Sequence, residues 1–193
     1  MISLEQGKKL VKLAREAVKT RKITHDYEKG LDIKRGVFVT IETYPEGDLR
    51  GCIGFPEPIY PLGEGVQRAA IAAAYQDPRF PPLTEEEMDK VVFEVSVLTE
   101  PELIEVGKPE EYFEKIEKGK DGLILQNGPF TGLFLPQVWK HFKTIEEFLE
   151  NLCYKAGLTP DYIYDKNTRI LRFRVKAFIE KEPGGEVYEE EVF

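Results

Sequence analysis

The stretch GVFVTIETYPEGDLRGCIGF, residues 36–55, predicts a β-hairpin and with it the class of the fold. Its first arm, GVFVTIETY, is rich in β-branched and aromatic residues, which favour strands. The sequence PEGD then predicts a turn, because proline and glycine provide the backbone angles that a tight reversal needs. LRGCIGF returns as the second arm, so the hairpin indicates an antiparallel sheet.

The rest of the chain mixes strands with helices. An N-terminal helix is predicted from the capping box of Ser3 and Gln6, and it should end near Lys22. The other predicted elements, in chain order, are helices over residues 65–75 and 84–90, a strand over 91–98, a helix from 109, two strands over 121–135, a helix over 144–156 and a long half-buried strand over 169–181. This pattern predicts an α+β fold in which a mainly antiparallel sheet is flanked by helices.

The length of 193 residues predicts a single domain, 1–193, with a smaller α+β subdomain. The segment rich in proline and glycine at residues 45–82 is the predicted smaller subdomain, and it carries the LRGCIG sequence. Residues 1–44 and 83–193 form the predicted larger subdomain.

Acidic residues outnumber basic residues by 35 to 27, which gives a net charge of −8. Such a chain repels polyphosphate, so nucleic-acid binding would require a local basic patch. Arg172, Arg174 and Lys176 form a basic stripe on the last long strand. A solvated or ion-paired face explains this stripe more simply than a nucleic-acid site does.

The sequence shows no apolar run of membrane-spanning length and no signal peptide, so we expect a cytoplasmic protein with no membrane contact. Cys52 and Cys153 are then expected to be free thiols. Two cysteines and two scattered histidines cannot form a standard structural zinc site, so no metal is predicted. No phosphate-binding glycine loop is present, and no cofactor is predicted. The abundance of Glu and Lys is typical of thermophilic proteins.

The segment Arg50-Gly51-Cys52 is the first candidate site. Strand alternation predicts that Arg50 and Cys52 share one face, where a guanidinium would favour the thiolate and lower the pKa of the cysteine. Cys52 is therefore the candidate catalytic thiol, and Arg50 is its candidate activator or an anchor for an anion. Gly51 and Gly54 permit a close backbone approach or a bulge, both common beside ligand sites.

The alternative is that Cys52 is a small packed residue and that Arg50 points to solvent. The residues alone favour this interpretation, because no histidine lies nearby in the sequence to act as a base. His25 and His141 would reach Cys52 only through folding.

Two further segments carry candidate binding residues. In AYQDPRFPPLT, the residues Asp77, Arg79 and Phe80 lie in a loop stiffened by prolines and are candidates for a binding wall, although the residues alone favour a helix end with a local Asp77–Arg79 ion pair. In GPFTGLFLPQVW, Gln137 and the single tryptophan could line a pocket. Equally, this segment could be a hairpin in which the tryptophan is an aromatic anchor. Cys153 shares the apolar stripe of its predicted helix and is expected in the core.

The segments LRGCIG, DPRFPPL, GLFLPQVW and FLENLCYKAGL resemble the AMMECR family, named after the chromosomal region of Alport syndrome, midface hypoplasia and elliptocytosis. The resemblance covers nearly the whole chain, without a departure in these blocks, and LRGCIG is the hallmark of the family. The chain is identified by this resemblance as a prokaryotic, archaeal member.

The resemblance implies a two-part α+β protein, but no settled biochemical activity. Prokaryotic relatives accompany a Memo-like protein with a dioxygenase-type fold and, in some genomes, a radical-SAM protein, which implies a shared pathway or complex. A polar hallmark between glycines also favours a site at Arg50 and Cys52, with Asp77, Arg79 and Phe80 as its opposite wall.

Three functions follow from these observations. We expect a protein that binds a small molecule or a protein partner in a cleft built around the LRGCIG strand and the DPRF loop. The alternative is a thiol-dependent enzyme, which requires an accessible Cys52 with a low pKa. A second alternative is a nucleic-acid-associated regulator, against which the acidic balance of the chain argues.

Overall fold

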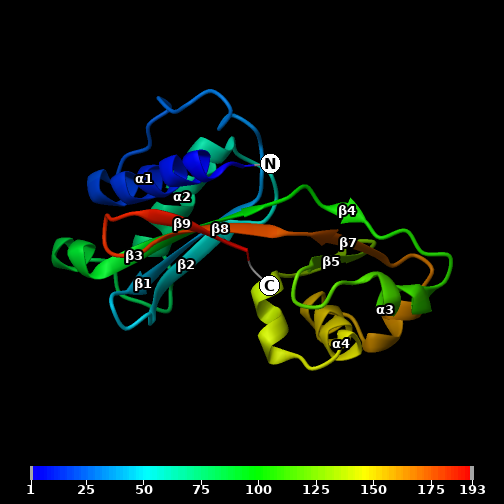
Figure 1. Ribbon diagram of the computed structural model, residues 1–193. Helices are drawn as coiled ribbons and strands as arrows, with labels where there is room; N and C mark the ends of the chain where they lie inside the picture. Colours follow the sequence, from blue (N-terminus) through cyan, green and yellow to red (C-terminus); the bar gives the residue numbers. More distant parts are fainter. Residues whose placement is uncertain (1, 192–193) are drawn as a thin grey trace. The chain divides into compact units, whose positions relative to one another are not determined.

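The computed structural model describes residues 2–191, so Met1, Val192 and Phe193 lie outside the description (Figure 1). Two sheets with antiparallel strand pairs are flanked by helices, which confirms the predicted α+β class. Within the described part, no helix is both long enough and apolar enough to cross a membrane.

The first of two compact units contains the chain up to Thr99 together with Lys176–Glu191. It is built on a five-stranded sheet with the order β2-β1-β3-β8-β9. These strands are β1 Val37–Thr43, β2 Leu49–Phe55, β3 Val91–Leu98, β8 Val175–Glu180 and β9 Val187–Glu191. Helices α1 (Leu4–Thr20) and α2 (Leu62–Tyr75) lie on one face of this sheet (Figure 1). The 3₁₀-helix η1 (Glu85–Lys90) comes directly before β3.

The core of this unit follows from strand alternation. Val39 and Ile41 of β1 are fully buried in one cluster with Phe93 and Val95 of β3 and with apolar residues of both helices. Successive side chains of a strand point to opposite faces. Thr40 stands between Val39 and Ile41, so its side chain lies on the face away from the helices. The polar residues of β1 therefore define the second face of the sheet.

The predicted hairpin is confirmed, and it contains a bulge. β1 and β2 are antiparallel, with Thr40 opposite Cys52. Ile41 lies opposite Gly51, whereas the next residue of β1 lies opposite Leu49, so Arg50 is an extra residue in β2. A β-bulge bends the strand and redirects the side chain of the extra residue. The bulge, one of the two uses predicted for these glycines, thus falls at Arg50.

The second unit, Glu100–Val175, has a four-stranded sheet with the order β4-β7-β5-β6. Its strands and helices are β4 Glu102–Leu103, η2 Pro109–Glu111, α3 Tyr112–Lys115, β5 Gly122–Asn127, β6 Phe130–Phe134, η3 Pro136–His141, α4 Ile145–Lys155, η4 Pro160–Tyr164 and β7 Arg169–Phe173. Trp139 stacks on Phe148 with ring centroids 3.7 Å apart and donates a hydrogen bond to the carbonyl oxygen of Asp121 at 2.7 Å. Trp139 is thus an aromatic anchor, and Cys153 is fully buried in the core, as predicted.

The predicted domain boundaries differ from the observed ones. Residues 45–82 do not form a separate subdomain, because β2 pairs with β1 and α2 packs into the same core. The chain divides instead after Thr99 and after Val175. Proline and glycine at residues 45–82 mark turns within one unit rather than a border between two.

The long strand predicted over residues 169–181 is two strands. β7 pairs with β5 in the four-stranded sheet, whereas β8 pairs with β9 in the five-stranded sheet. Arg174 separates them. Side-chain alternation is the same whether a strand continues in one sheet or passes from one sheet to another, so the pattern did not reveal the break.

Candidate functional site

Arg50 is held by η1 and by the loop that precedes it. Its Nε and Nη2 donate hydrogen bonds to Glu87 at 2.7 and 3.0 Å, and its Nη1 donates to the carbonyl oxygen of Pro81 at 3.0 Å. The guanidinium also lies 6.0 Å from the centre of the Phe80 ring. Only 11% of the Arg50 side chain is exposed. Arg50 therefore joins β2 to η1, and the predicted pairing of its guanidinium with the thiol of Cys52 is wrong.

The two glycines of LRGCIG lie where a side chain would overlap a neighbouring residue of the first unit. A Cβ atom at Gly51 would lie 2.2 Å from the carbonyl oxygen of Ala73, so Gly51 lets α2 pack directly on β2. A Cβ atom at Gly54 would lie 2.4 Å from the ring of Phe38. Packing thus explains both glycines without a ligand, and their predicted role in binding stays a prediction.

Asp77 and Arg79 close the outer edge of β2, which is the edge strand of its sheet. The backbone N–H of Cys52 donates to Asp77 Oδ2 at 2.9 Å, and Arg79 Nη2 donates to the carbonyl oxygen of Cys52 at 3.2 Å. These two side chains bind the groups that a neighbouring strand would otherwise bind, which protects the edge. The structure therefore brings Asp77 and Arg79 to Cys52, although they are 25 and 27 residues away in the sequence.

The ion pair of Asp77 and Arg79 is strongly organised. Arg79 Nε and Nη2 donate to the two carboxylate oxygens of Asp77 at 2.9 and 2.7 Å. These hydrogen bonds from Arg79, with the N–H groups of Cys52 and Arg79, hold the pKa of the buried Asp77 far below its usual range. The Arg79 side chain is 53% exposed. Its Nη1 donates no hydrogen bond within residues 2–191, so Arg79 presents a fixed cation at the surface.

The thiol of Cys52 is half buried and lies on the face of the sheet away from the helices. Thr40 donates a hydrogen bond from Oγ1 to Cys52 Sγ at 3.4 Å. Burial raises the pKa of Cys52, and the opposing effects of the Thr40 hydroxyl and of the Arg79 charge do not cancel it. The expectation of an activated thiol with a lowered pKa is therefore not met, and the cation that favours the thiolate is Arg79 rather than Arg50.

Glu94 of β3 belongs to the same surface and was missed in the sequence. Thr40 lies between Cys52 and Glu94 in one row across three strands, so all three side chains share a face. Burial raises the pKa of Glu94, the hydroxyl of Ser96 at 2.7 Å lowers it, and the charges of Glu42 and Glu190 raise it. Glu94 is the only acidic residue in the apolar run VVFEVSVL, and this was the feature of the sequence that could have identified it as a candidate.

The other predicted residues fall into two groups. Phe80 lies beside the ion pair, with its ring centre 5.6 Å from the Arg79 guanidinium carbon. Gln137 and His141 belong to η3 of the second unit, where the Oε1 atom of Gln137 is buried and accepts no hydrogen bond within residues 2–191. His25 is 72% exposed and lies 3.9 Å from Glu64. His25 makes no hydrogen bond with Cys52 in the described structure, and His141 belongs to the other unit.

Acidic residues neutralise the basic stripe formed by Arg172 of β7, Lys176 of β8 and Arg174 between these strands. Arg172 lies 4.0 Å from Glu102, Arg174 lies 2.6 Å from Glu117, and Lys176 lies 2.8 Å from Glu189; these are the distances between the charged atoms. The ion-paired explanation of the stripe is confirmed.

No group of three or more His, Cys, Asp or Glu side chains within residues 2–191 is arranged to hold a metal ion.

Comparison with known proteins gives consistent matches over the full chain. A family model described as AMMECR1 matches residues 11–178. Protein MJ0810 of Methanocaldococcus jannaschii is 48% identical over 198 residues, covering 100% of this chain and 98% of that protein. Protein PYRAB00100 of Pyrococcus abyssi is 50% identical over 198 residues, covering 95% and 94%. The crystal structure of the uncharacterized protein PH0010 from Pyrococcus horikoshii matches with a TM-score of 0.84 and 48% identity, covering 99% of each chain.

Proposed function

The chain belongs to the AMMECR1 family, as the LRGCIG segment predicted, and on that premise we propose that it binds an anionic group at the outer edge of β2. The anion belongs to a small molecule or to a protein partner, and Arg79 is its main binding residue. Cys52, Thr40 and Phe80 form the surface around it. This function is binding rather than thiol chemistry.

The exposed guanidinium of Arg79, fixed by Asp77, is the observation that carries this proposal. Because Asp77 and Cys52 already hold the arginine in one orientation, binding costs little side-chain entropy. Arg50, in contrast, is mostly buried and has all three guanidinium nitrogens engaged. The anchor for an anion therefore moves from Arg50, the sequence-based choice, to Arg79.

Thiol-dependent catalysis is the second candidate, and Glu94 is the observation that favours it. A carboxyl group with a raised pKa in the same row as Cys52 supplies the acid or base that the sequence lacked. Adjacent strands lie about 4.8 Å apart, so Cys52 and Glu94 are separated by roughly 10 Å, and a substrate would have to lie between them. The raised pKa of Cys52 argues against this candidate.

Calorimetric titration of the full chain tests the proposal with two kinds of probe. The small-molecule probes are succinate and inorganic phosphate, and the protein probe is an archaeal Memo-like protein. We expect at least one probe to bind the wild type and to lose about tenfold or more in affinity with Arg79→Gln, as expected for a charge-assisted hydrogen bond.

Arg68→Gln is the matched control, because Arg68 is also half exposed, lies in the same unit and pairs with an acid, Glu64, at 2.7 Å. Its affinity should equal that of the wild type. Equal affinity of Arg79→Gln and wild type, or no binding by any of the three probes, would contradict the proposal.

A further inference from the structure

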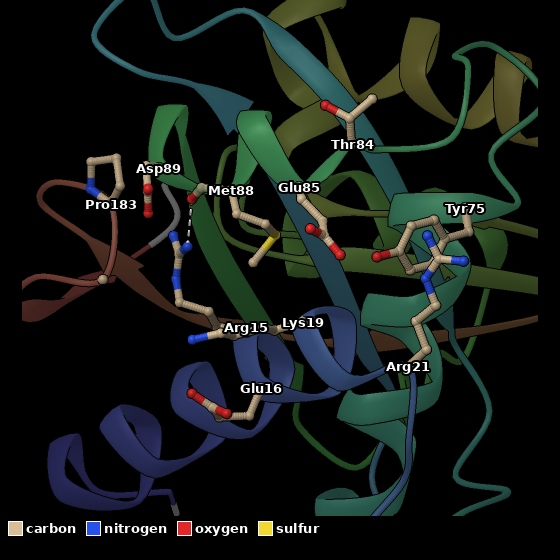
Figure 2. Close-up of a pocket in the computed structure, with 11 residues that line it drawn as sticks. Arg15, Glu16, Lys19, Arg21, Tyr75, Thr84, Glu85, Met88, Asp89 and Pro183 are labelled. Atoms are coloured by element: carbon tan, nitrogen blue, oxygen red, sulfur yellow. Dashed lines mark hydrogen bonds between the residues drawn. The ribbon is translucent and has the colours of Figure 1, made fainter.

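A cavity lies in the first unit beside η1 and α1. Its volume is about 460 Å³, which is within the range of small-molecule sites. The C-terminal half of α1, the end of α2, η1 and the turn between β8 and β9 form its walls. Figure 2 shows Arg21 and Tyr75 at one end, Asp89 and Pro183 at the other, and Met88 and Glu85 between them.

Arg15 forms part of the cavity wall but is fully engaged by the protein. It donates to the carbonyl oxygens of Met88 and Val91 at 2.8 and 2.7 Å and forms a bidentate pair with Glu180. Figure 2 shows the first of these bonds, which fixes η1 against α1. A buried ion pair thus forms part of the wall, whereas the other charged side chains that line the cavity are exposed.

The remaining charged side chains of the cavity have no ionic or hydrogen-bonding partner among residues 2–191. The two cations are Lys19 and Arg21, and the three acids are Glu16, Glu85 and Asp89. A purely anionic ligand would face the acids, and a purely cationic ligand would face the cations. A ligand that carries both charges meets a partner for each, so the charges of the cavity are complementary to a zwitterion.

The position of Arg21 gives an independent indication of a site. Arg21 ends α1 with a φ of 55°, a left-handed conformation that normally favours glycine at a helix end. Its guanidinium lies over the Tyr75 ring at 4.5 Å from the centre, and the Tyr75 hydroxyl is fixed by a hydrogen bond to the carbonyl oxygen of Val18 at 2.9 Å. Strained backbone that places a charged group at the mouth of a cavity is typical of functional sites.

We propose that this cavity binds a zwitterionic ligand of dipeptide size. The ligand's carboxylate pairs with Lys19 and Arg21, its ammonium group pairs with Glu85 or Asp89, and its middle lies over the side chain of Met88. This site is separate from the Arg79 surface, so the two proposals stand or fall independently.

Methyl NMR of the full chain tests the proposal, because the sequence contains only two methionines, Met1 and Met88. With ¹³C-methyl methionine, Met88→Leu assigns the Met88 signal. Alanyl-alanine should shift that signal saturably. N-acetyl-alanyl-alanine, which lacks the ammonium group, and alanyl-alanine amide, which lacks the carboxylate, should each bind about threefold more weakly, within the range for one exposed ion pair.

Arg21→Gly identifies the end that holds the carboxylate, because glycine keeps the left-handed backbone and removes the guanidinium. It should weaken alanyl-alanine and leave the amide form unaffected. Lys22→Gln, a neighbouring exposed lysine outside the cavity, should change neither. A Met88 signal that does not move, equal affinity of all three peptide forms, or full affinity for alanyl-alanine in Arg21→Gly would each overturn the proposal.

Discussion

Arg50 connects three segments through its guanidinium, and this explains why a polar residue stands in the middle of the hairpin. It binds both carboxylate oxygens of Glu87 and the backbone at Pro81. The pairing with Arg50 is also the first cause of the lowered pKa of Glu87. A buried arginine in this setting is a structural residue, whereas the half-exposed Arg79 is available for binding.

We expect Arg50→Gln to reduce the free energy of unfolding by about 2 kcal/mol at pH 7, because it removes a charge-assisted bidentate pair that is largely shielded from water. Urea denaturation measures this change. Arg68→Gln breaks a pair within α2 in which the arginine side chain is 40% exposed, against 11% for Arg50, and should cost less than about 1 kcal/mol. Equal losses in the two variants would contradict the structural role of Arg50.

Glu94→Gln should make the protein more stable at pH 7. The pKa of Glu94 is raised in the folded state, first by burial, so the protonated form is favoured on folding. Its stabilising contribution is complete below the unfolded pKa of about 4.3 and is lost as the pH rises through the folded pKa.

Glutamine keeps the bond to Ser96 without the charge, and we expect a gain of up to about 1 kcal/mol at pH 7, the usual limit for one residue on a sheet face. The gain should shrink toward pH 4. Urea denaturation at both values measures it, and a loss of stability at pH 7 would refute the assignment. A gain would mean that the ionised Glu94 is kept for a reason other than stability.

At the scale of elements, the sequence was informative wherever a local rule applied. A capping box identified α1, hydrophobic patterns identified β1 and β3, and the turn at PEGD identified the hairpin. Strand alternation failed at Arg50, because the bulge inserts a residue and changes the direction of its side chain. It failed again at Arg174, where one pattern is shared by two sheets.

A substitution at Gly51 tests whether the close packing of α2 on β2 requires a glycine at this position. We expect Gly51→Ala to cost about 2 kcal/mol or more, because the new methyl group would overlap the backbone at Ala73 and the helix would have to move. Hydrogen exchange of the β1 and β2 amides measures the loss in this unit. Gly65→Ala is the matched control in helix α2, since its nearest neighbour is the end of the Val37 side chain, 3.3 Å away. A tolerated Gly51→Ala would show that the hallmark glycine has another purpose.

At the scale of the whole molecule, the fold class and the family were predictable, but the division of the chain and the composition of the site were not. Residues 45–82 were rich in turn-forming residues, yet their contacts place them inside the first unit. The contacts of Asp77 and Arg79 with Cys52 depend on how the loop after α2 returns to the edge of β2. No local pattern encodes such a long-range contact, although the Asp77–Arg79 pair itself was foreseen.

Arg79, and not Arg50, is the cation beside Cys52, and the Cys52 thiol is not activated. The direct test is the rate of iodoacetamide reaction against pH for wild type, Arg79→Gln and Arg50→Gln. Cys153 is buried and its pKa is raised to about 11, so Cys52 dominates the reaction in the folded protein. We predict a Cys52 pKa above the free-thiol value of about 8.5, a higher one in Arg79→Gln and an unchanged one in Arg50→Gln. A wild-type pKa below 8.5 that rises when Arg50 is removed would contradict the account.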